Sequence, residues 1–185
     1  MIVQDIEITL KDGRKAILRS PRREDAQGLI DYLVKSAEET DFLLRNPEEC
    51  VKYTVEGEYK FIDSMNEADN MATLVCEVDG RIAGNCQISW PKHMKTRHRA
   101  DIGIALTSEY WGLGIGSAMF REMQKIAEAN ENILQMELEF VEGNTRARAL
   151  YEKMGFRITG VRPDAIMGRD GKLKNEYTMT KKIER

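Results

Sequence analysis

The chain has 185 residues, of which 42% are hydrophobic and 32% are charged. This length suits one domain with a sizeable core, and the composition is that of an ordinary globular protein. A net charge of −3 provides no basic surface for nucleic acid, and no apolar run reaches the roughly 18 residues of a membrane span. We therefore expect a single domain over residues 1–185, without nucleic-acid or membrane partners. The N-terminus lacks a signal-peptide pattern, which favours a cytoplasmic location.

Cysteine and histidine are too sparse to indicate a metal site. Cys50, Cys76 and Cys86 show no metal-ligand spacing, so we interpret them as reduced and mostly packed. His93 and His98 are too few and too isolated for a metal site. We interpret His98 as a solvated histidine at a strand end, with a histidine that faces a substrate as the alternative. The sequence predicts no metal.

The first predicted elements are a hairpin and two helices. Alternating residues at 6–10 and 16–19 flank Asp12-Gly13, a pattern typical of a β-hairpin. Residues 22–37 place apolar side chains on one helical face. A further helix is expected to begin at Asn46-Pro47 and to run through Met65, with a break at Gly57.

A second hairpin is expected from residues 71–78 and 81–90 around Asp79-Gly80. A two-residue turn would place Cys76 opposite Ala83 and away from Cys86, so a disulfide between the two cysteines is not expected. Residues 91–97 are predicted to form a loop.

A glycine-rich stretch follows a predicted strand that contains Ile104, Ala105 and Leu106. Gly112, Gly114 and Gly116 come next, and residues 118–129 are predicted to be helical. Glycines allow the backbone to approach a ligand closely, and the first N–H groups of a helix have no partner inside it. Together these features indicate a seat for a pyrophosphate.

Other nucleotide-binding patterns fit this stretch poorly. The dinucleotide fingerprint needs G-x-G-x-x-G early in a βαβ unit, and the phosphate loop needs a lysine before Ser117, where Gly116 stands. A tight turn between a strand and a helix, without a ligand, is the alternative that this stretch alone leaves open.

Residues 134–141 alternate as a strand that places Glu137 and Glu139 on one face. Asn144 is a good N-cap for the next helix, and Gly155 a plausible end. Tyr151 lies two helical turns beyond Asn144, and a core tyrosine is the plain interpretation of that position. Two final strands are expected at 156–161 and 173–181.

Two of these stretches resemble the GCN5-related N-acetyltransferase (GNAT) superfamily. Residues 111–116, W-G-L-G-I-G, are similar to its acetyl-CoA motif Q/R-x-x-G-x-G/A, with tryptophan in place of glutamine or arginine. That difference leaves open whether Trp111 contacts the cofactor. Residues 144–156 are similar to the second signature of the superfamily, and 138–144, L-E-F-V-E-G-N, resemble the L-E-V-x-x-x-N of ribosomal-protein N-terminal alanine acetyltransferases.

The resemblance implies an α/β fold with a central mixed, mostly antiparallel twisted sheet of six to seven strands and about four helices. It implies acetyl-CoA as the acetyl donor, a small-molecule or peptide primary amine as the acceptor, and direct transfer without a metal. Glu139 would be the general base and Tyr151 the general acid. The implied cofactor-binding residues are Ile104, Ala105, Leu106, Trp111, Gly112, Leu113, Gly114, Ile115, Gly116, Ser117, Asn144, Ala147 and Tyr151.

Several alternatives stay open at this point. Glu137, water or, more weakly, Asp101 competes with Glu139 for the role of base. A module of the same fold that binds acyl-CoA without transferring the acyl group is the second hypothesis. A nucleotide-binding α/β domain is the third, and it would need a parallel sheet. The sequence names no acceptor and leaves a homodimer open.

Overall fold

The computed structural model describes residues 1–184, so Arg185, the last residue of the expected domain, lies outside the described part. The chain forms two compact units. The first comprises Met1–Ser89 and Gly103–Met119, and the second Trp90–Ile102 and Phe120–Arg185.

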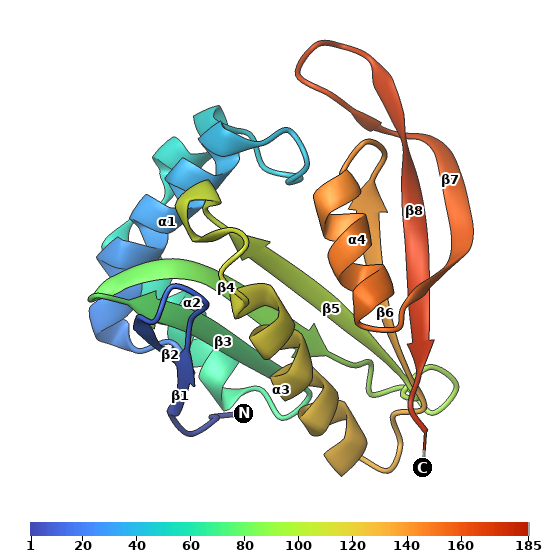
Figure 1. Cartoon of the computed structure of the whole chain (residues 1–185), viewed down its shortest axis with the longest axis horizontal. Coiled ribbons are helices and arrows are strands. Elements are labelled where there is room, and N and C mark those ends of the chain that lie inside the picture. Colours follow the sequence, from blue (N-terminus) through green and yellow to red (C-terminus); the bar gives the residue numbers. More distant parts are fainter. Residues whose placement is uncertain (185) are drawn as a thin grey trace. The chain divides into compact units, whose positions relative to one another are not determined.

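The first unit is built on antiparallel hairpins (Figure 1). Its strands are β1 (Ile6–Thr9), β2 (Lys15–Arg19), β3 (Met71–Val78), β4 (Arg81–Ser89) and the second half of β5 (Arg99–Leu106), adjacent in that order. The β1–β2, β2–β3 and β3–β4 pairs are antiparallel, so both predicted hairpins are confirmed.

The β3–β4 register differs from the expected one in its interior. Val78 pairs with Arg81, as a two-residue turn requires, but a register shift between Cys76 and Glu77 places Cys76 opposite Gly84 and not Ala83. A β-bulge of this kind adds one residue to one strand and displaces every later pair. Cys86 pairs with Leu74, and both cysteines are free thiols.

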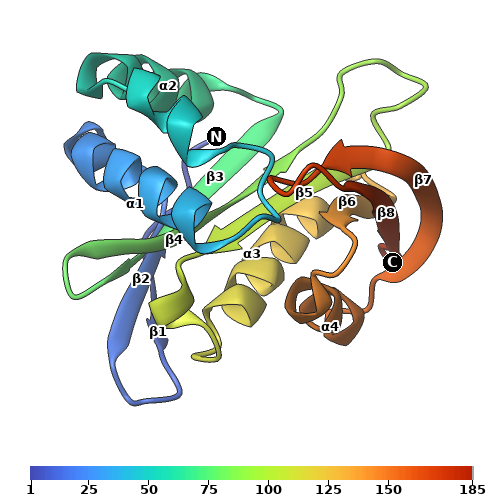
Figure 2. The ribbon, with the colours of Figure 1, turned by 90° about the horizontal axis from the view of Figure 1, so that it is seen from above.

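Two helices cover this part of the chain. The 3-10 helix η1 (Arg23–Asp25) leads into α1 (Ala26–Glu39), and η2 (Pro47–Lys52) precedes α2 (Val55–Glu67). Figure 2 shows α1 and α2 side by side, and they pack against β4 and β3 respectively. Ala26, Leu29, Tyr32, Ile62, Met65 and Val75 form a buried apolar cluster between these elements.

The expected break at Gly57 was wrong, because the interruption occurs at Tyr53 and Thr54, between η2 and α2. The Thr54 hydroxyl accepts a hydrogen bond from the Gly57 N–H at 3.1 Å and so acts as the N-cap of α2. Gly57 therefore lies inside the first turn of the helix.

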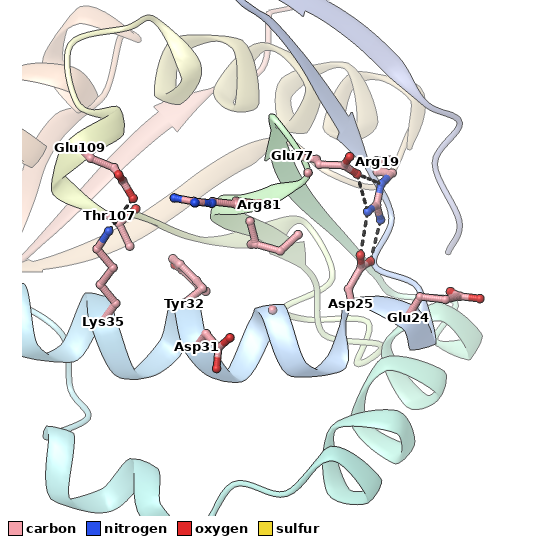
Figure 3. A pocket seen from close by; sticks show the side chains of 13 residues that line it. Arg19, Glu24, Asp25, Asp31, Tyr32, Lys35, Glu77, Arg81, Thr107 and Glu109 are labelled. Carbon is pink, nitrogen blue, oxygen red and sulfur yellow. Dashed lines mark hydrogen bonds and ion pairs between the residues drawn. The ribbon is translucent and has the colours of Figure 1, made fainter.

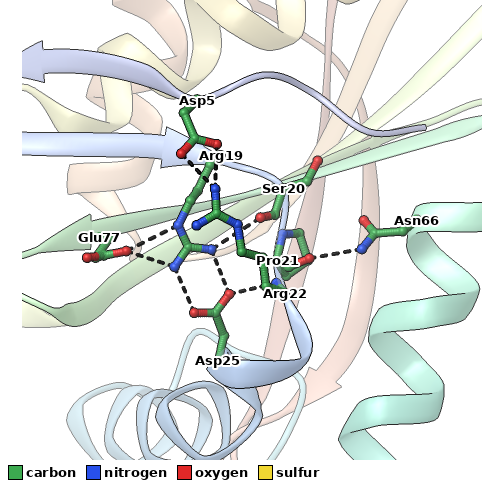
Figure 4. Close-up of polar contacts among 8 residues, drawn as sticks. All are labelled: Asp5, Arg19, Ser20, Pro21, Arg22, Asp25, Asn66 and Glu77. Atoms are coloured by element: carbon green, nitrogen blue, oxygen red, sulfur yellow. Dashed lines mark hydrogen bonds and ion pairs between the residues drawn. The ribbon is translucent and has the colours of Figure 1, made fainter.

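A buried arginine joins the N-terminal strands to α1 (Figure 4). Arg19 is 4% exposed, and its guanidinium donates to both carboxylate oxygens of Asp25 at 2.6 and 2.7 Å. It also donates to Glu77 at 2.7 Å and to the carbonyl of Ser20 at 3.2 Å. The Arg19 side chain thus connects β2, η1 and β3 through charge-assisted hydrogen bonds.

The second unit contains the first half of β5, then β6 (Gln135–Val141), β8 (Leu173–Lys182) and β7 (Arg157–Met167), adjacent in that order. The β5–β6 pair is parallel, and the β6–β8 and β7–β8 pairs are antiparallel. The helix α4 (Thr145–Lys153) follows β6, and the remaining helix, α3 (Ile115–Ala129), begins in the first unit and ends in the second.

The fold class is the expected one, a mixed α/β fold with mostly antiparallel strands. Within residues 1–184 there are eight strands, four α-helices and three short 3-10 helices, so the strand number exceeds the expected six to seven. The prevalence of antiparallel pairs argues against the third hypothesis, which required a parallel sheet. In the described chain no helix is long and apolar enough to span a membrane.

Candidate active site

The glycine loop of the first unit has the backbone geometry that the sequence predicts. Gly112 and Gly114 have φ angles of 78° and 96°, a backbone conformation that residues with a Cβ rarely adopt. The helix begins at Ile115, three residues earlier than expected, so Gly116 lies within its first turn. The first helical bond runs from the Ala118 N–H to the Gly114 carbonyl at 3.1 Å, which leaves the preceding N–H groups without partners inside the helix.

Two hydrogen bonds connect this loop to its neighbours. The indole Nε1–H of Trp111 donates to the Leu106 carbonyl at 2.9 Å, and the Lys11 N–H donates to the Leu113 carbonyl at 3.1 Å. Trp111, at the position of the motif's glutamine or arginine, therefore connects the loop to the end of β5. The β1–β2 turn supports the loop from another strand pair, a contact that the sequence alone did not predict.

The end of β5 is held in place by two hydrogen bonds and by the close approach of Gly84. The Thr107 N–H donates to the Ala83 carbonyl at 3.0 Å, and the Tyr32 hydroxyl donates to the Ala105 carbonyl at 3.0 Å. A Cβ placed on Gly84 would lie 2.4 Å from that same Ala105 oxygen. β4 can therefore come this close to β5 only with glycine at position 84. Gly84 of β4 is thus a structural residue beside the end of β5, and its role was not predicted from the sequence.

In the second unit, α4 positions the residues of the second motif. The Asn144 side chain accepts a hydrogen bond from the Ala147 N–H at 3.2 Å, which confirms Asn144 as the N-cap. Gly155 has a φ of 89° and ends the helix, also as expected.

Tyr151 lies on α4 with its ring in an aromatic cluster. The ring meets Phe120 edge-on at 5.6 Å and Phe140 at 6.1 Å between centroids, and the residue is 7% exposed. Burial raises the pKa of Tyr151 to about 12. Its hydroxyl has no hydrogen-bond partner among residues 1–184, yet it is not sealed from solvent. The ring is therefore a core element, while its hydroxyl is free to donate to a ligand.

Three carboxylates lie on β5 and β6 of the second unit. Asp101 pairs in register with Glu137, and Glu139 lies on the same face of β6 as Glu137. Glu137 is 3.5 Å from Arg99 and accepts a hydrogen bond from Gln135, whereas Glu139 is half-exposed and 3.7 Å from Arg162. Burial, then the charge of Glu137 and that of Glu139, raise the pKa of Asp101 despite the opposing charge of Arg99. Of the three carboxylates, Glu137 therefore has the most contacts with neighbouring side chains.

A separate pocket of about 580 Å³ lies in the first unit (Figure 3). It is lined by Arg19, Glu24, Asp25, Gly28, Asp31, Tyr32, Lys35, Glu77, Gly80, Arg81, Ile82, Thr107 and Glu109. Lys35 and Glu109 form an ion pair across it at 2.5 Å. The lining includes none of the residues predicted to bind the cofactor, so this pocket is distinct from the predicted cofactor site.

Comparison with known proteins identifies the family. The model of the Acetyltransferase (GNAT) family matches residues 30–156. The L-amino acid N-acetyltransferase AaaT of Escherichia coli (strain K12) is 26% identical over 125 residues, which cover 68% of this chain and 76% of that protein. The chain belongs to the GNAT acetyltransferase family and is an N-acetyltransferase by that membership.

Solved structures agree with this assignment. A GNAT-family acetyltransferase from Streptococcus pneumoniae has a TM-score of 0.82 and 28% identity, over 91% of this chain and 99% of that chain. A ribosomal alpha-N-protein acetyltransferase in complex with coenzyme A has a TM-score of 0.75 and 16% identity, over 91% and 94% of the two chains. At that identity the second likeness concerns the fold alone.

Proposed function

We propose that the chain transfers acetyl from acetyl-CoA to a primary amine by direct attack within a ternary complex. The observation that carries the proposal is the loop before α3, where two glycines at positive φ precede helical N–H groups that have no partners inside the helix. Such N–H groups, with the positive end of the helix dipole, suit a diphosphate. Membership of the GNAT family, and a fold shared with a protein solved in complex with coenzyme A, support this choice of ligand.

The cofactor would be held by backbone and side-chain groups of both motifs. Residues 112–117 would bind the diphosphate, Asn144 and Ala147 the pantetheine arm, and residues 104–106 the thioester carbonyl. A backbone N–H of that strand would donate to the oxyanion that forms during attack. The contacts of Ala105 with Gly84 and Tyr32 support this role, because a fixed strand keeps the donor in position.

Glu139 would be the general base. An amine must lose its proton before it can attack, and a half-exposed carboxylate accepts that proton directly or through water. The distance of 3.7 Å to Arg162 makes a weak ion pair that an approaching substrate can replace.

Tyr151 would be the general acid. With a pKa of about 12 the phenol is protonated throughout the working pH range. Proton transfer to a thiolate, whose reference pKa is about 8.5, is then uphill by about 5 kcal/mol. That cost fits within the roughly 16 kcal/mol barrier of a typical enzyme turning over about ten times per second. Hydrogen bonding to the sulfur as its charge develops would therefore precede a late proton transfer.

The experiment that tests the proposal is an assay of free-thiol release from acetyl-CoA in the presence of a panel of amines. The expected result is one thiol released for each acetylated amine detected by mass spectrometry. Binding of acetyl-CoA without thiol release for any amine would favour the non-catalytic acyl-CoA-binding module.

A further inference from the structure

A glutamate in the first unit is buried within an apolar helix face. Glu58 of α2 is 7% exposed, and it follows Val55 by three residues and precedes Ile62 by four. These spacings place the three side chains on one face of the helix. Val55 and Ile62 pack in the apolar cluster that also contacts Ala105 of β5.

The Glu58 carboxylate has no internal partner. Nothing in residues 1–184 forms a hydrogen bond or an ion pair with it, and burial alone raises its pKa, with no contribution from a charged group. The charged groups nearest to it along α2 are engaged elsewhere, since Glu56 pairs with Lys60 at 2.8 Å and Asp63 with Arg23.

Solvent nevertheless reaches this carboxylate. In the described chain, Glu176 Oε2 is the one buried side-chain oxygen that is sealed from solvent and lacks a hydrogen bond, although Arg162 lies 2.8 Å from it as an ion pair. The oxygens of Glu58 are not sealed in this way. A buried, unpaired but accessible carboxylate is costly to the fold, and such groups are found where a ligand supplies the missing partner.

The surroundings of Glu58 relate it to residues 104–106 at the end of β5. Its neighbours Val55 and Ile62 share the cluster with Tyr32, whose hydroxyl donates to the Ala105 carbonyl at 3.0 Å. Residues 104–106 are those that we propose for the thioester carbonyl. Glu58 is thus on the helix face that packs into the cluster against which Ala105 of β5 also packs.

We propose that Glu58 binds the ammonium group of the acceptor, so that the acceptor is a cationic primary amine with an apolar group beside it. The inference rests on the proposed transfer reaction. An ammonium group brings three N–H donors and a positive charge, which together satisfy the carboxylate. Val55 and the partly buried Leu33 supply the apolar contact. The proton then leaves to the general base before attack.

The test compares Glu58→Gln with Glu56→Gln, a matched change two residues away at an exposed position of the same helix. The probes are the tripeptide Ala-Ala-Ala, L-leucine and spermidine, each assayed with acetyl-CoA. At pH 6.5, Glu58→Gln should raise KM for the accepted amine at least about tenfold, because a buried charge partner is lost. In Glu58→Gln, KM for acetyl-CoA should not rise and the unfolding temperature should not fall. Glu56→Gln should behave as wild type in all three measurements.

The pH dependence separates binding of a cation from a structural role. For Ala-Ala-Ala, whose terminal amine has a pKa near 8, the effect of Glu58→Gln should shrink at pH 9, where the amine is neutral. Equal KM values for the two variants would overturn the inference. A rise in KM for both substrates together with a lower unfolding temperature would also overturn it.

A failure of the transfer reaction itself gives a different result. If wild type releases no thiol with any probe, the proposed function falls, and calorimetric titration of Ala-Ala-Ala into the protein with coenzyme A decides the role of Glu58. Weaker binding by Glu58→Gln than by Glu56→Gln sustains the inference, and equal binding overturns it.

Discussion

The Ala105 carbonyl oxygen lies where a side chain on Gly84 would have to be. A Cβ at Gly84 would be 2.4 Å from that oxygen and 2.9 Å from the Leu106 Cα, distances that real Cβ atoms do not show. Because these neighbours are backbone atoms, they cannot rotate away. The close approach of β4 to the end of β5 therefore depends on the absence of a side chain at position 84.

We predict that Gly84→Ala lowers both turnover and stability. Overpacking of this kind typically costs about 1–3 kcal/mol, and turnover should fall at least about tenfold because small displacements of catalytic groups are costly. The control is Gly28→Ala, a change inside helix α1. A Cβ at Gly28 would lie 3.5 Å from Ile82, an ordinary contact distance, so this variant should be slightly more stable than wild type. Thermal unfolding and the thiol-release assay measure both effects, and a Gly84→Ala protein with wild-type values would refute the argument.

Arg19 is predicted to dominate the stability of the N-terminal strands. Arg19→Met leaves Asp25 and Glu77 without their shared cation, which should cost about 3–5 kcal/mol in urea denaturation at pH 7. Lys15→Met, which breaks only the exposed ion pair with Glu7, should cost less than about 1 kcal/mol. Similar losses for the two variants would show that the buried network contributes little.

The pH dependence of stability should follow from Asp25. Burial would raise the pKa of Asp25, but the hydrogen bonds from Arg19 and Arg22 outweigh it and lower the pKa below its usual value. The stability that Asp25 contributes to the folded state is therefore present above about pH 4. It is lost as the pH falls through the lower, folded-state pKa of Asp25. Wild type should lose stability over this acid range, and Arg19→Met should lose less of it. Parallel acid profiles for the two proteins would contradict this assignment.

Tyr151→Phe is predicted to separate catalysis from packing. The hydroxyl has no protein partner among the residues described, so its removal should leave the unfolding temperature and the affinity for acetyl-CoA unchanged. Turnover should fall more than about tenfold, in the range expected when general acid catalysis is lost. Tyr177→Phe, in the same aromatic cluster against Phe140, is the control and should retain turnover. Unchanged turnover in Tyr151→Phe would remove the residue from the acid role.

Much of this arrangement could be predicted from the sequence because it is local. Glycines at positive φ, the Asn144 N-cap and the Asp79-Gly80 turn are each determined by a few neighbouring residues. The register error at Cys76 and the misplaced helix break at Gly57 arose where a bulge and a threonine cap intervened. Both depend on backbone details that composition does not specify.

Other features could not be predicted because they depend on tertiary packing. Glu58 appears in the sequence as an ordinary polar residue of an amphipathic helix, and only the folded chain shows that it is buried without a partner. Gly84 resembles any glycine in a strand until β5 lies against it. The same holds for Arg19, whose partners come from residues 25 and 77.

Glu139→Gln is predicted to flatten the rise of turnover with pH, because the group that accepts the amine proton is lost. It should also move the pKa of Asp101 back towards its usual value, since the Glu139 charge contributes to its rise. A pH–rate profile of Asp101→Asn gives the comparison. A wild-type profile in Glu139→Gln would transfer the role of base to Asp101, Glu137 or water.

The crystal structure of the protein with coenzyme A tests the central claim most directly. We predict diphosphate oxygens within hydrogen-bond distance of main-chain N–H groups in residues 112–117, and the Tyr151 hydroxyl within hydrogen-bond distance of the sulfur. A cofactor bound at another surface, or a Tyr151 hydroxyl directed away from the sulfur, would contradict it.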